Sequence, residues 1–221
     1  VKHVPDNPNT ISDKIVRAIA DDGTCIWVGT HSNGLNRINK NSKHIIRYFH
    51  DESGKSISCN NIRSLFLNQD LLWIGHTNGL DVLNIKDSNP EILSLNDICN
   101  FPDDEVTCIG KDCFGQIWAG TWNHGVIRII QKNNRFECTI FKESQPATSA
   151  FTPKRVISLY ADEIYPEVFY SSGEQLIRLM LNEEGQIKHT IQYQADESNQ
   201  HTLNSNFIST IRRQNDSVLW L

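Results

Sequence analysis

Polar and aromatic side chains recur at one place in this sequence, directly after short apolar runs that contain Trp-x-Gly. His31 and Asn33 occupy this place first, and His76 and Asn78 occupy it in the next occurrence. The third occurrence reads Trp122-Asn123-His124. Hydrogen-bonding groups beside an indole suit an oligosaccharide, because sugar hydroxyls need polar partners and apolar sugar faces stack on Trp.

Two residues on the segments that link one unit to the next, Lys14 and Asn61, are expected at the same surface. Polar loops are also the usual covering of a solvated rim, so the assignment is a prediction that contact with a ligand must test. The predicted ligand-binding residues are His31, Asn33, His76, Asn78, Trp122, Asn123, His124, Lys14 and Asn61.

Metal binding and catalysis are the two other chemistries that these loops suggest. Three histidines on adjacent loops suggest a metal, but no acidic partner recurs with them, and we predict neither a metal nor a cofactor. A lyase or hydrolase needs a positioned acid or base. Asp103-Asp104-Glu105 is the acidic cluster on a proposed link, and solvation explains it. We therefore predict no catalytic residue in this chain.

The elements that carry these loops form a repeat. One unit consists of four short apolar runs rich in β-branched and aromatic residues, separated by Gly, Asn and Asp, which is typical of antiparallel strands. No helix is expected. The first unit has its runs at 15–19, 26–30, 33–38 and 45–49, and the second and third units place Trp73 and Trp118 where the first has Trp27.

Later units depart from this pattern. The fourth has Phe169 where Trp is expected, and the fifth supplies an expected strand at 207–211 and ends inside its second strand, at Trp220-Leu221. A period of roughly 45 to 50 residues suits a four-stranded blade. We predict an all-β fold: a β-propeller of four-stranded antiparallel blades, here an incomplete arc of about four blades plus a partial fifth.

The whole chain, 1–221, is expected to form one propeller fragment. Its repeat units are predicted at 10–55, 56–100, 101–150, 151–200 and 201–221. A complete ring of seven such blades would need more residues, so we expect a piece of a longer propeller. Its open edge strands are expected to favour self-association.

Tryptophans and glycines of the repeat have structural explanations. The strand Cys25-Ile26-Trp27-Val28 is apolar on both faces, as stacked blades require and an ordinary two-sheet sandwich does not. Gly34, Gly79 and Gly125 are predicted to adopt positive φ in hairpin turns, and Gly29, Gly75 and Gly120 to allow close approach of a neighbouring backbone. The structural residues of the repeat are Trp27, Gly29, Gly34, Trp73, Gly75, Gly79, Trp118, Gly120, Gly125 and Trp220.

Composition excludes some partners. The net charge of -5 offers no basic excess for phosphate backbones, so nucleic acid is not an expected partner. No apolar run reaches the roughly 18 residues that span a bilayer. The six cysteines form no Cys-x-x-Cys pair, and most are expected to be small buried hydrophobic residues, although a disulfide such as Cys99 with Cys108 is possible.

The repeat spelling resembles a known family. Its pattern is Trp-[Val/Ile/Ala]-Gly-[Thr/His], then Asn or His, Gly, and Leu or Val, preceded by Ser-x-x-x-[Ile/Val], as at Ser12-Asp13-Lys14-Ile15-Val16 and Ser58-Cys59-Asn60-Asn61-Ile62. This pattern is similar to the two-component regulator propeller repeats. Those repeats form the periplasmic sensor of hybrid two-component histidine kinases, typified by gut Bacteroidetes. WD and kelch repeats are less similar, because Trp-Asp and the Gly-Gly doublet are both missing.

The resemblance implies a role in signal transduction. This chain would be an extracytoplasmic, periplasmic ligand-sensing segment that responds to oligosaccharides from polysaccharide breakdown and so contributes to transcription regulation. It would not itself be an enzyme, because the kinase core of such proteins lies elsewhere. Its partners would be a glycan oligosaccharide and a second sensor chain, with the membrane reached only through downstream segments. The alternatives are a propeller enzyme, streptogramin-lyase-like or glycan-cleaving, and a protein-interaction scaffold.

Overall fold

The computed structural model describes residues 2–53, 55–87, 91–133, 135–141, 155–196 and 198–221. The chain divides into two compact units, Val1–Val106 and Thr107–Leu221, and each is described by itself. That residues 1–221 form one propeller fragment remains a prediction.

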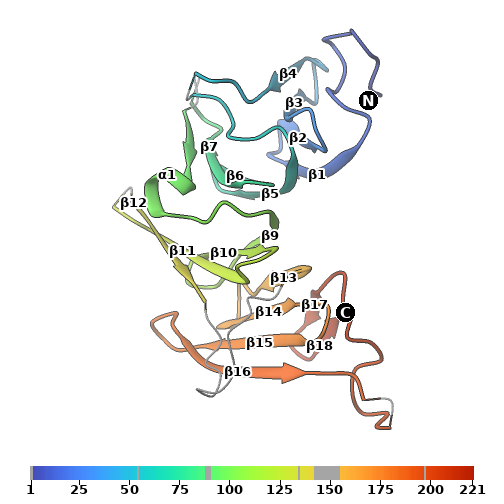
Figure 1. Ribbon diagram of the computed structural model, residues 1–221, viewed down its shortest axis with the longest axis vertical. Coiled ribbons are helices and arrows are strands. Elements are labelled where there is room, and N and C mark those ends of the chain that lie inside the picture. The colour runs from blue at the N-terminus through green and yellow to red at the C-terminus, as the bar shows by residue number, and fades with distance from the viewer. Residues whose placement is uncertain (1, 54, 88–90, 134, 142–154, 197) are drawn as a thin grey trace. The chain divides into compact units, whose positions relative to one another are not determined.

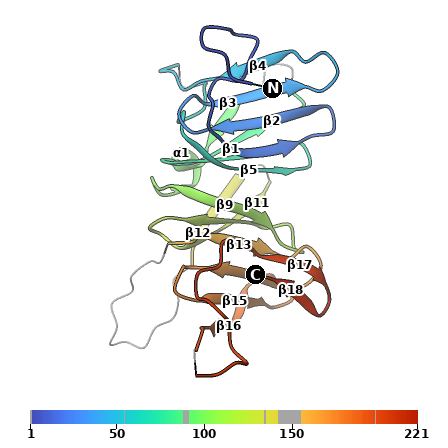
Figure 2. The ribbon, with the colours of Figure 1, turned by 90° about the vertical axis from the view of Figure 1, so that its right-hand side faces the viewer.

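The first unit contains two four-stranded antiparallel sheets in which sequential strands are neighbours (Figures 1 and 2). Each sheet is a meander that a single hairpin-forming sequence unit can build without crossovers. The first sheet consists of β1 (Val16–Asp21), β2 (Cys25–Thr30), β3 (Leu35–Asn39) and β4 (Ile45–Tyr48). The second consists of β5 (Ile62–Asn68), β6 (Leu71–His76), β7 (Gly79–Asn84) and β8 (Ile92–Ser94), and is followed by the short helix α1 (Leu95–Cys99).

The second unit contains two further meanders of the same kind and a hairpin. One sheet consists of β9 (Val106–Lys111), β10 (Ile117–Thr121), β11 (Val126–Lys132) and β12 (Arg135–Ile140). The next consists of β13 (Ser158–Ala161), β14 (Glu167–Ser171), β15 (Leu176–Leu181) and β16 (Ile187–Tyr193). The hairpin pairs β17 (Arg212–Asn215) with β18 (Val218–Trp220).

These sheets confirm the all-β class and the order of antiparallel strands, and they also correct two expectations. The link after β8 forms helix α1, whose buried Leu95 anchors it, although no helix was expected. The prediction of a strand at 207–211 is wrong, because the first strand of the hairpin begins at Arg212. Ile208 and Ile211 are buried instead against Phe169 and Leu176.

Sheets pack face to face within each unit. In the first unit, Trp27 and Leu35 of the first sheet lie in one cluster with Ile62, Leu72 and Ile74 of the second. All five side chains are essentially inaccessible to solvent. This packing buries the Trp27 face of β2, and Val28 on the opposite face is buried in a separate cluster, so both faces are covered as the apolar run around Trp27 predicted.

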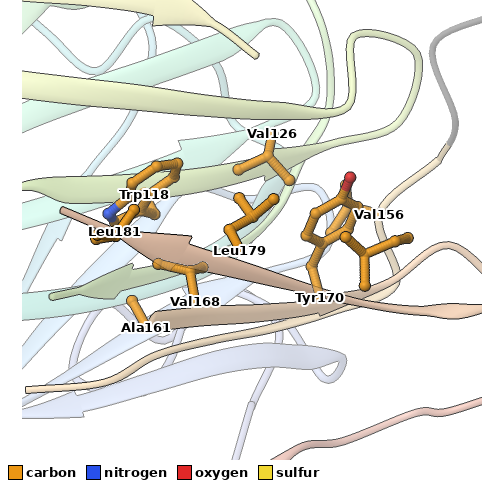
Figure 3. Packing of buried hydrophobic residues seen from close by; sticks show 9 residues of the cluster. Trp118, Val126, Val156, Ala161, Val168, Tyr170, Leu179 and Leu181 are labelled. Carbon is orange, nitrogen blue, oxygen red and sulfur yellow. The ribbon is translucent and has the colours of Figure 1, made fainter. Parts of the chain in front are cut away.

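Figure 3 shows the equivalent packing in the second unit, where Trp118 and Val126 point toward Leu179 and Tyr170 of the next sheet. Trp118 is completely buried. Trp27 and Trp118 are therefore core residues that fill the space between neighbouring sheets, whereas Trp220 in the final hairpin is 63% exposed.

A carboxylate at the turn before the second strand holds the Trp in place. Asp112 accepts the indole N–H of Trp118 at 2.8 Å, and its other oxygen accepts the N–H groups of Phe114 and Gln116 at 2.9 Å. Asp22 does the same for Trp27, also at 2.8 Å. Burial opposes ionisation of Asp22, but hydrogen bonds from the Cys25 N–H and the indole outweigh it and lower its pKa.

Glycines of the repeat were predicted partly correctly. Gly34, Gly79 and Gly125 have positive φ, as expected for hairpin turns. The prediction of a close neighbouring backbone at the other glycines is wrong, because side chains approach there. A Cβ on Gly120 would lie 2.5 Å from the Cγ1 atom of Val156, and one on Gly75 would lie 2.2 Å from Ser64 Oγ.

The cysteines fall into two groups. Cys25, Cys59, Cys108 and Cys113 are free, and Cys99 and Cys138 are disulfide-bonded. A Cys99–Cys108 disulfide is therefore excluded. Cys25 is buried, whereas Cys59, Cys108 and Cys113 are partly buried as whole residues.

The Asp112 carboxylate provides the first test of this fold. Asp112→Asn replaces an acceptor by an NH2 group, which cannot accept both the Trp118 indole N–H and the Gln116 side-chain N–H that Asp112 Oδ2 now accepts. Leaving buried donors unpaired costs about 1–3 kcal/mol. We expect the melting temperature to fall, measured by circular dichroism, while the exposed Asp6→Asn leaves it unchanged. Equal melting temperatures for Asp112→Asn and the wild type would contradict this role.

The close contact at Gly120 provides a second test. Gly120→Ala places a methyl group against Val156, and such overpacking costs about 1–3 kcal/mol. Gly110→Ala is the matched control, since its nearest neighbour would lie at 3.1 Å and is the end of a Leu159 side chain. We expect the larger loss of unfolding free energy in denaturant titrations of Gly120→Ala. A larger loss of unfolding free energy for Gly110→Ala would contradict this expectation and show that the Val156 side chain moves aside at little cost.

Candidate functional site

The link before β1 and the β2–β3 loop are joined by Asp13 in the first unit. Its carboxylate accepts the backbone N–H of Ser32 at 3.1 Å, the Ser32 hydroxyl at 2.9 Å and the Ile15 N–H at 3.1 Å. Burial opposes ionisation, but these hydrogen bonds outweigh it and lower the pKa of Asp13. Beside this fixed carboxylate, Lys14 is exposed.

His31 lies next to Ser32 in the same loop. Its N–H donates to the Ile15 carbonyl at 3.0 Å, which fixes the backbone of the loop against the link. Its side chain is half-buried, and the ring atom Nδ1 is buried without a hydrogen-bond partner among the described residues. A buried polar atom without a partner is costly.

Asn33 and Asn78 occupy equivalent places in the two hairpins of the first unit, and both are exposed. The Asn33 N–H donates to Thr30 Oγ1 at 3.2 Å, and the Asn78 carbonyl accepts from the Asn96 side chain at 2.9 Å. Their backbones are thus held by hydrogen bonds of the fold. The amide groups of their side chains face the solvent side of the turns.

His76 differs from the other predicted site residues because it is completely buried. Nδ1 accepts the Asn78 N–H at 3.2 Å, and Nε2 lies 3.4 Å from Asp81 Oδ1, which is also completely buried. A side chain enclosed in this way is not at the surface for a ligand to touch. The sequence placed His76 on the rim because it follows the strand core Trp73-Ile74-Gly75, but it is the last residue of β6 and faces inward.

Asn61 lies beside this buried group, on the link before β5. Its carbonyl accepts the Thr77 N–H at 3.2 Å, so the link and the β6–β7 turn are held together. The side-chain oxygen Oδ1 is buried and has no hydrogen-bond partner in the described ranges. Asn61 and His31 thus each present an unsatisfied polar atom in the first unit.

In the second unit, Trp122, Asn123 and His124 form the β10–β11 turn. Trp122 is 39% exposed, and the guanidinium carbon of Arg155 lies 3.7 Å from its ring centroid. This cation–π contact occupies one face of the predicted aromatic platform. The backbone N–H of His124 donates to Thr121 Oγ1 at 3.1 Å, which keeps the turn tight.

The acidic cluster on the link before β9 is occupied by structural contacts. Asp103 accepts from Asn96 at 2.7 Å, the buried Asp104 accepts the Glu105 N–H at 2.8 Å, and Glu105 pairs with Arg63 at 3.2 Å. Each of these carboxylates is engaged in at least one hydrogen bond or ion pair. Within the described ranges, no group of three His, Cys, Asp or Glu side chains is arranged to hold a metal ion.

Sequence reasoning missed a pocket of about 490 Å³ in the second unit. It brings together β14, β15 and the β17–β18 hairpin, with Tyr165, Phe169, Arg178 and Tyr193 in its lining. Three of its charged groups are paired with one another, because Glu167 binds Arg178 at 2.5 Å and also binds Arg213. The sequence signal for this pocket was Phe169 at the Trp position of the repeat, because Phe is smaller than Trp and has no indole N–H.

Comparison with known proteins adds family information to this geometry. No family model matches the chain. Histidine kinase P4 of Formosa agariphila is 35% identical to it over 162 residues, which are 69% of this chain and 11% of that protein. The chain therefore spans about a tenth of the length of this relative.

One solved structure is the extracellular domain of BT4673 from B. thetaiotaomicron, described as a hybrid two component system. It superimposes with a TM-score of 0.72 and 19% identity over 97% of this chain and 27% of that one. This chain has the fold of that extracellular domain. The resemblance to two-component sensor proteins that the repeats predict is confirmed by these two matches.

The β-propeller domain of Cps50 (Swd1) from Myceliophteria thermophila is also similar in fold to this chain. Its TM-score is 0.60 at 10% identity, over 91% of this chain and 59% of that one. The predicted fold class, a β-propeller with four four-stranded blades and a partial fifth, is confirmed by this match together with the sheets. None of the described helices is both long and apolar enough to span a membrane.

The cysteines of this chain yield a further prediction. Under denaturing conditions without reductant, a thiol reagent should detect the four free cysteines, and after reduction all six. The measurement is a colorimetric thiol titration with mass-spectrometric mapping. Alkylation of Cys99 or Cys138 before reduction would contradict the structure.

Proposed function

We propose that this chain is the extracytoplasmic, ligand-sensing propeller segment of a hybrid two-component histidine kinase and that its ligand is an oligosaccharide. The observation that carries the proposal is the 35% identity with a histidine kinase over 69% of the chain. The fold shared with the extracellular domain of BT4673 supports it. The repeat units at 10–55, 56–100, 101–150, 151–200 and 201–221 would be its blades.

A periplasmic location is consistent with the cysteines. Disulfides persist in oxidising compartments and are rare in the cytosol. Cys99 and Cys138 are disulfide-bonded, which favours an extracytoplasmic environment. The extracellular origin of the BT4673 domain supports the same location.

The ligand surface of the first unit would consist of the exposed or half-buried members of the predicted set. Lys14, Asn33 and Asn78 are exposed, and His31 and Asn61 each hold a buried polar atom that lacks a partner in the described part of the chain. Donors and acceptors of this kind match the alternating hydroxyls of a sugar.

The second unit would contribute a stacking surface by itself. Trp122 has one ring face against Arg155, and 39% of the residue is exposed. A pyranose ring has apolar C–H faces that stack on such an indole. Asn123 and His124 follow it directly and would hydrogen-bond the sugar rim.

The two alternatives have less support. A propeller enzyme needs a free acid or base, and Asp103, Asp104 and Glu105 are each engaged in hydrogen bonds or ion pairs. A protein-interaction scaffold would use the same rim without a small ligand. The proposal also includes self-association, either through blade edges or as a sensor dimer.

A thermal-shift screen against oligosaccharides tests the proposal. A ligand at about ten times its Kd stabilises the folded chain by about 1.4 kcal/mol, a rise of several degrees in melting temperature. Trp122→Ala should abolish that rise, and Trp220→Ala, which changes another exposed tryptophan, should preserve it.

The outcomes separate the candidate functions. If no oligosaccharide raises the melting temperature, the carbohydrate assignment is wrong. If an oligosaccharide is consumed during incubation, detected by chromatography, the enzyme alternative replaces the sensor. If Trp220→Ala abolishes the rise and Trp122→Ala does not, the binding surface lies outside the predicted set.

A further inference from the structure

The second repeat carries three titratable side chains at places where the first repeat has other hydrogen-bonding residues. The slots are those of the link, the end of the second strand and the third strand. In the first repeat they hold Asp13, Thr30 and Asn36, and in the second they hold Cys59, His76 and Asp81.

The fold does not require the histidine. Thr30 closes its hairpin by donating its hydroxyl to the Gly34 carbonyl at 2.8 Å, and Thr121 does the same to Gly125 at 2.8 Å. A threonine is therefore sufficient at this slot in two repeats. The Cys–His–Asp combination in the second repeat needs an explanation other than blade formation.

Hydrogen bonds fix the orientation of the buried pair. The Asn78 N–H donates to His76 Nδ1, and Nε2 lies 3.4 Å from Asp81 Oδ1. Asp81 is held in turn by Ser58, whose N–H and hydroxyl donate to it at 2.7 and 2.6 Å. The ring therefore cannot rotate without breaking several contacts.

Cys59 lies at the accessible end of this group. Its sulfur is 3.3 Å from Thr77 Oγ1 and accepts the Asn61 N–H at 3.4 Å, and the side chain of His76 lies close to it. Burial opposes ionisation, but these neighbours outweigh it and lower the pKa of the thiol to about 7. Donors arranged around a sulfur favour the reactive thiolate.

The other free cysteines lack this combination. Burial raises the pKa of Cys108 to about 11, and Cys25 is buried. Cys113 is half-buried like Cys59, but burial and the neighbouring Asp112 carboxylate raise its pKa. Cys113 is therefore an internal reference that is also partly buried and whose pKa is shifted in the opposite direction.

We propose that Cys59 is a reactive thiol and a modification site for small disulfides. Its thiolate attacks one sulfur of a low-molecular-weight disulfide, R–S–S–R. The bond between the two reagent sulfurs breaks, a Cys59–S–S–R bond forms, and the second half leaves as the thiolate R–S⁻. The reagent is the oxidant: one of its two sulfur atoms is reduced to the thiolate, and Cys59 is oxidised.

The adduct has a structural consequence at the neighbouring turn. A substituent on the sulfur removes its acceptor role toward the Asn61 N–H and displaces the Thr77 hydroxyl. Asn61 and Thr77 are themselves joined by a backbone hydrogen bond. Modification would therefore shift Asn61 and the turn that contains Asn78, and the effect of this shift on ligand binding rests on the proposed function.

Competitive labelling of the whole wild-type chain tests the proposal without any ligand. The folded protein, without reductant, is exposed to a limiting amount of an aromatic disulfide at pH 7, and modified peptides are quantified by mass spectrometry. About half of a thiol with a pKa near 7 is ionised at this pH, and the accompanying loss of nucleophilicity leaves a net gain of about three- to sixfold over an ordinary thiol. Cys59 should therefore react at least about threefold faster than Cys113.

The pH profile distinguishes an activated thiol from one that is merely accessible. The titratable side chains that the structure places around the sulfur are His76 on β6 and, behind it, Asp81 on β7. The thiolate forms as the pH rises, so the rate at Cys59 should reach half its plateau near pH 7. A midpoint at or above about 8.5, or a rate no faster than that of Cys113, would overturn the proposal.

Two variants complete the test. Thr77→Val removes one donor and retains the shape of the side chain, so the midpoint at Cys59 should rise and the rate at pH 7 should fall. Cys113→Ser should change neither. An unchanged midpoint in Thr77→Val would refute the role given to this hydroxyl. An absent oligosaccharide response with fast labelling of Cys59 would count against the proposed function alone.

Discussion

In the first and third sheets a carboxylate at the first hairpin turn accepts the indole N–H of a buried Trp, and the cores of these two blades depend on this interaction. The large Trp side chain is what fills the space between neighbouring sheets, and burying its N–H without an acceptor costs free energy. Asp22 and Asp112 supply that acceptor and use their remaining lone pairs to close the turn itself. One side chain thereby satisfies the local turn and the long-range core together.

Much of this fold could be predicted from the sequence, because its constraints are local and repeat. Both faces of β2 are apolar, the Trp recurs in the same strand, and Gly34, Gly79 and Gly125 need positive φ. The link at 207–211 was mistaken for a strand because Ile208 and Ile211 are as apolar as strand residues. Burial of a link and burial of a strand give the same hydrophobic signal.

The candidate site was less predictable. His76 was expected at the surface, yet the Thr residues at its slot in other repeats are completely buried, and that comparison could have placed it inside. The pocket beside Phe169 could not be predicted, because it joins residues near 165–181 to residues near 213–221 and depends on how a hairpin packs on a sheet. Disulfide formation at Cys99 and Cys138 also depends on distances in space that spacing along the chain does not give.

The decayed fourth repeat changes how stability is distributed along the chain. Asp162 occupies the turn position of Asp22 and Asp112, and it accepts the Ile164 and Tyr165 N–H groups in the same way. Phe169 offers no indole N–H, so the second carboxylate oxygen of Asp162 binds Arg213 of β17 instead, at 2.5 Å. A contact that is internal to one sheet elsewhere becomes a contact between sequential sheets. The stability of a repeat protein is the sum of the intrinsic stability of each repeat and of the interactions between neighbouring repeats. In the fourth repeat the first of these is weakened and the second is strengthened. The β13–β16 sheet and the β17–β18 hairpin should therefore open as one cooperative step.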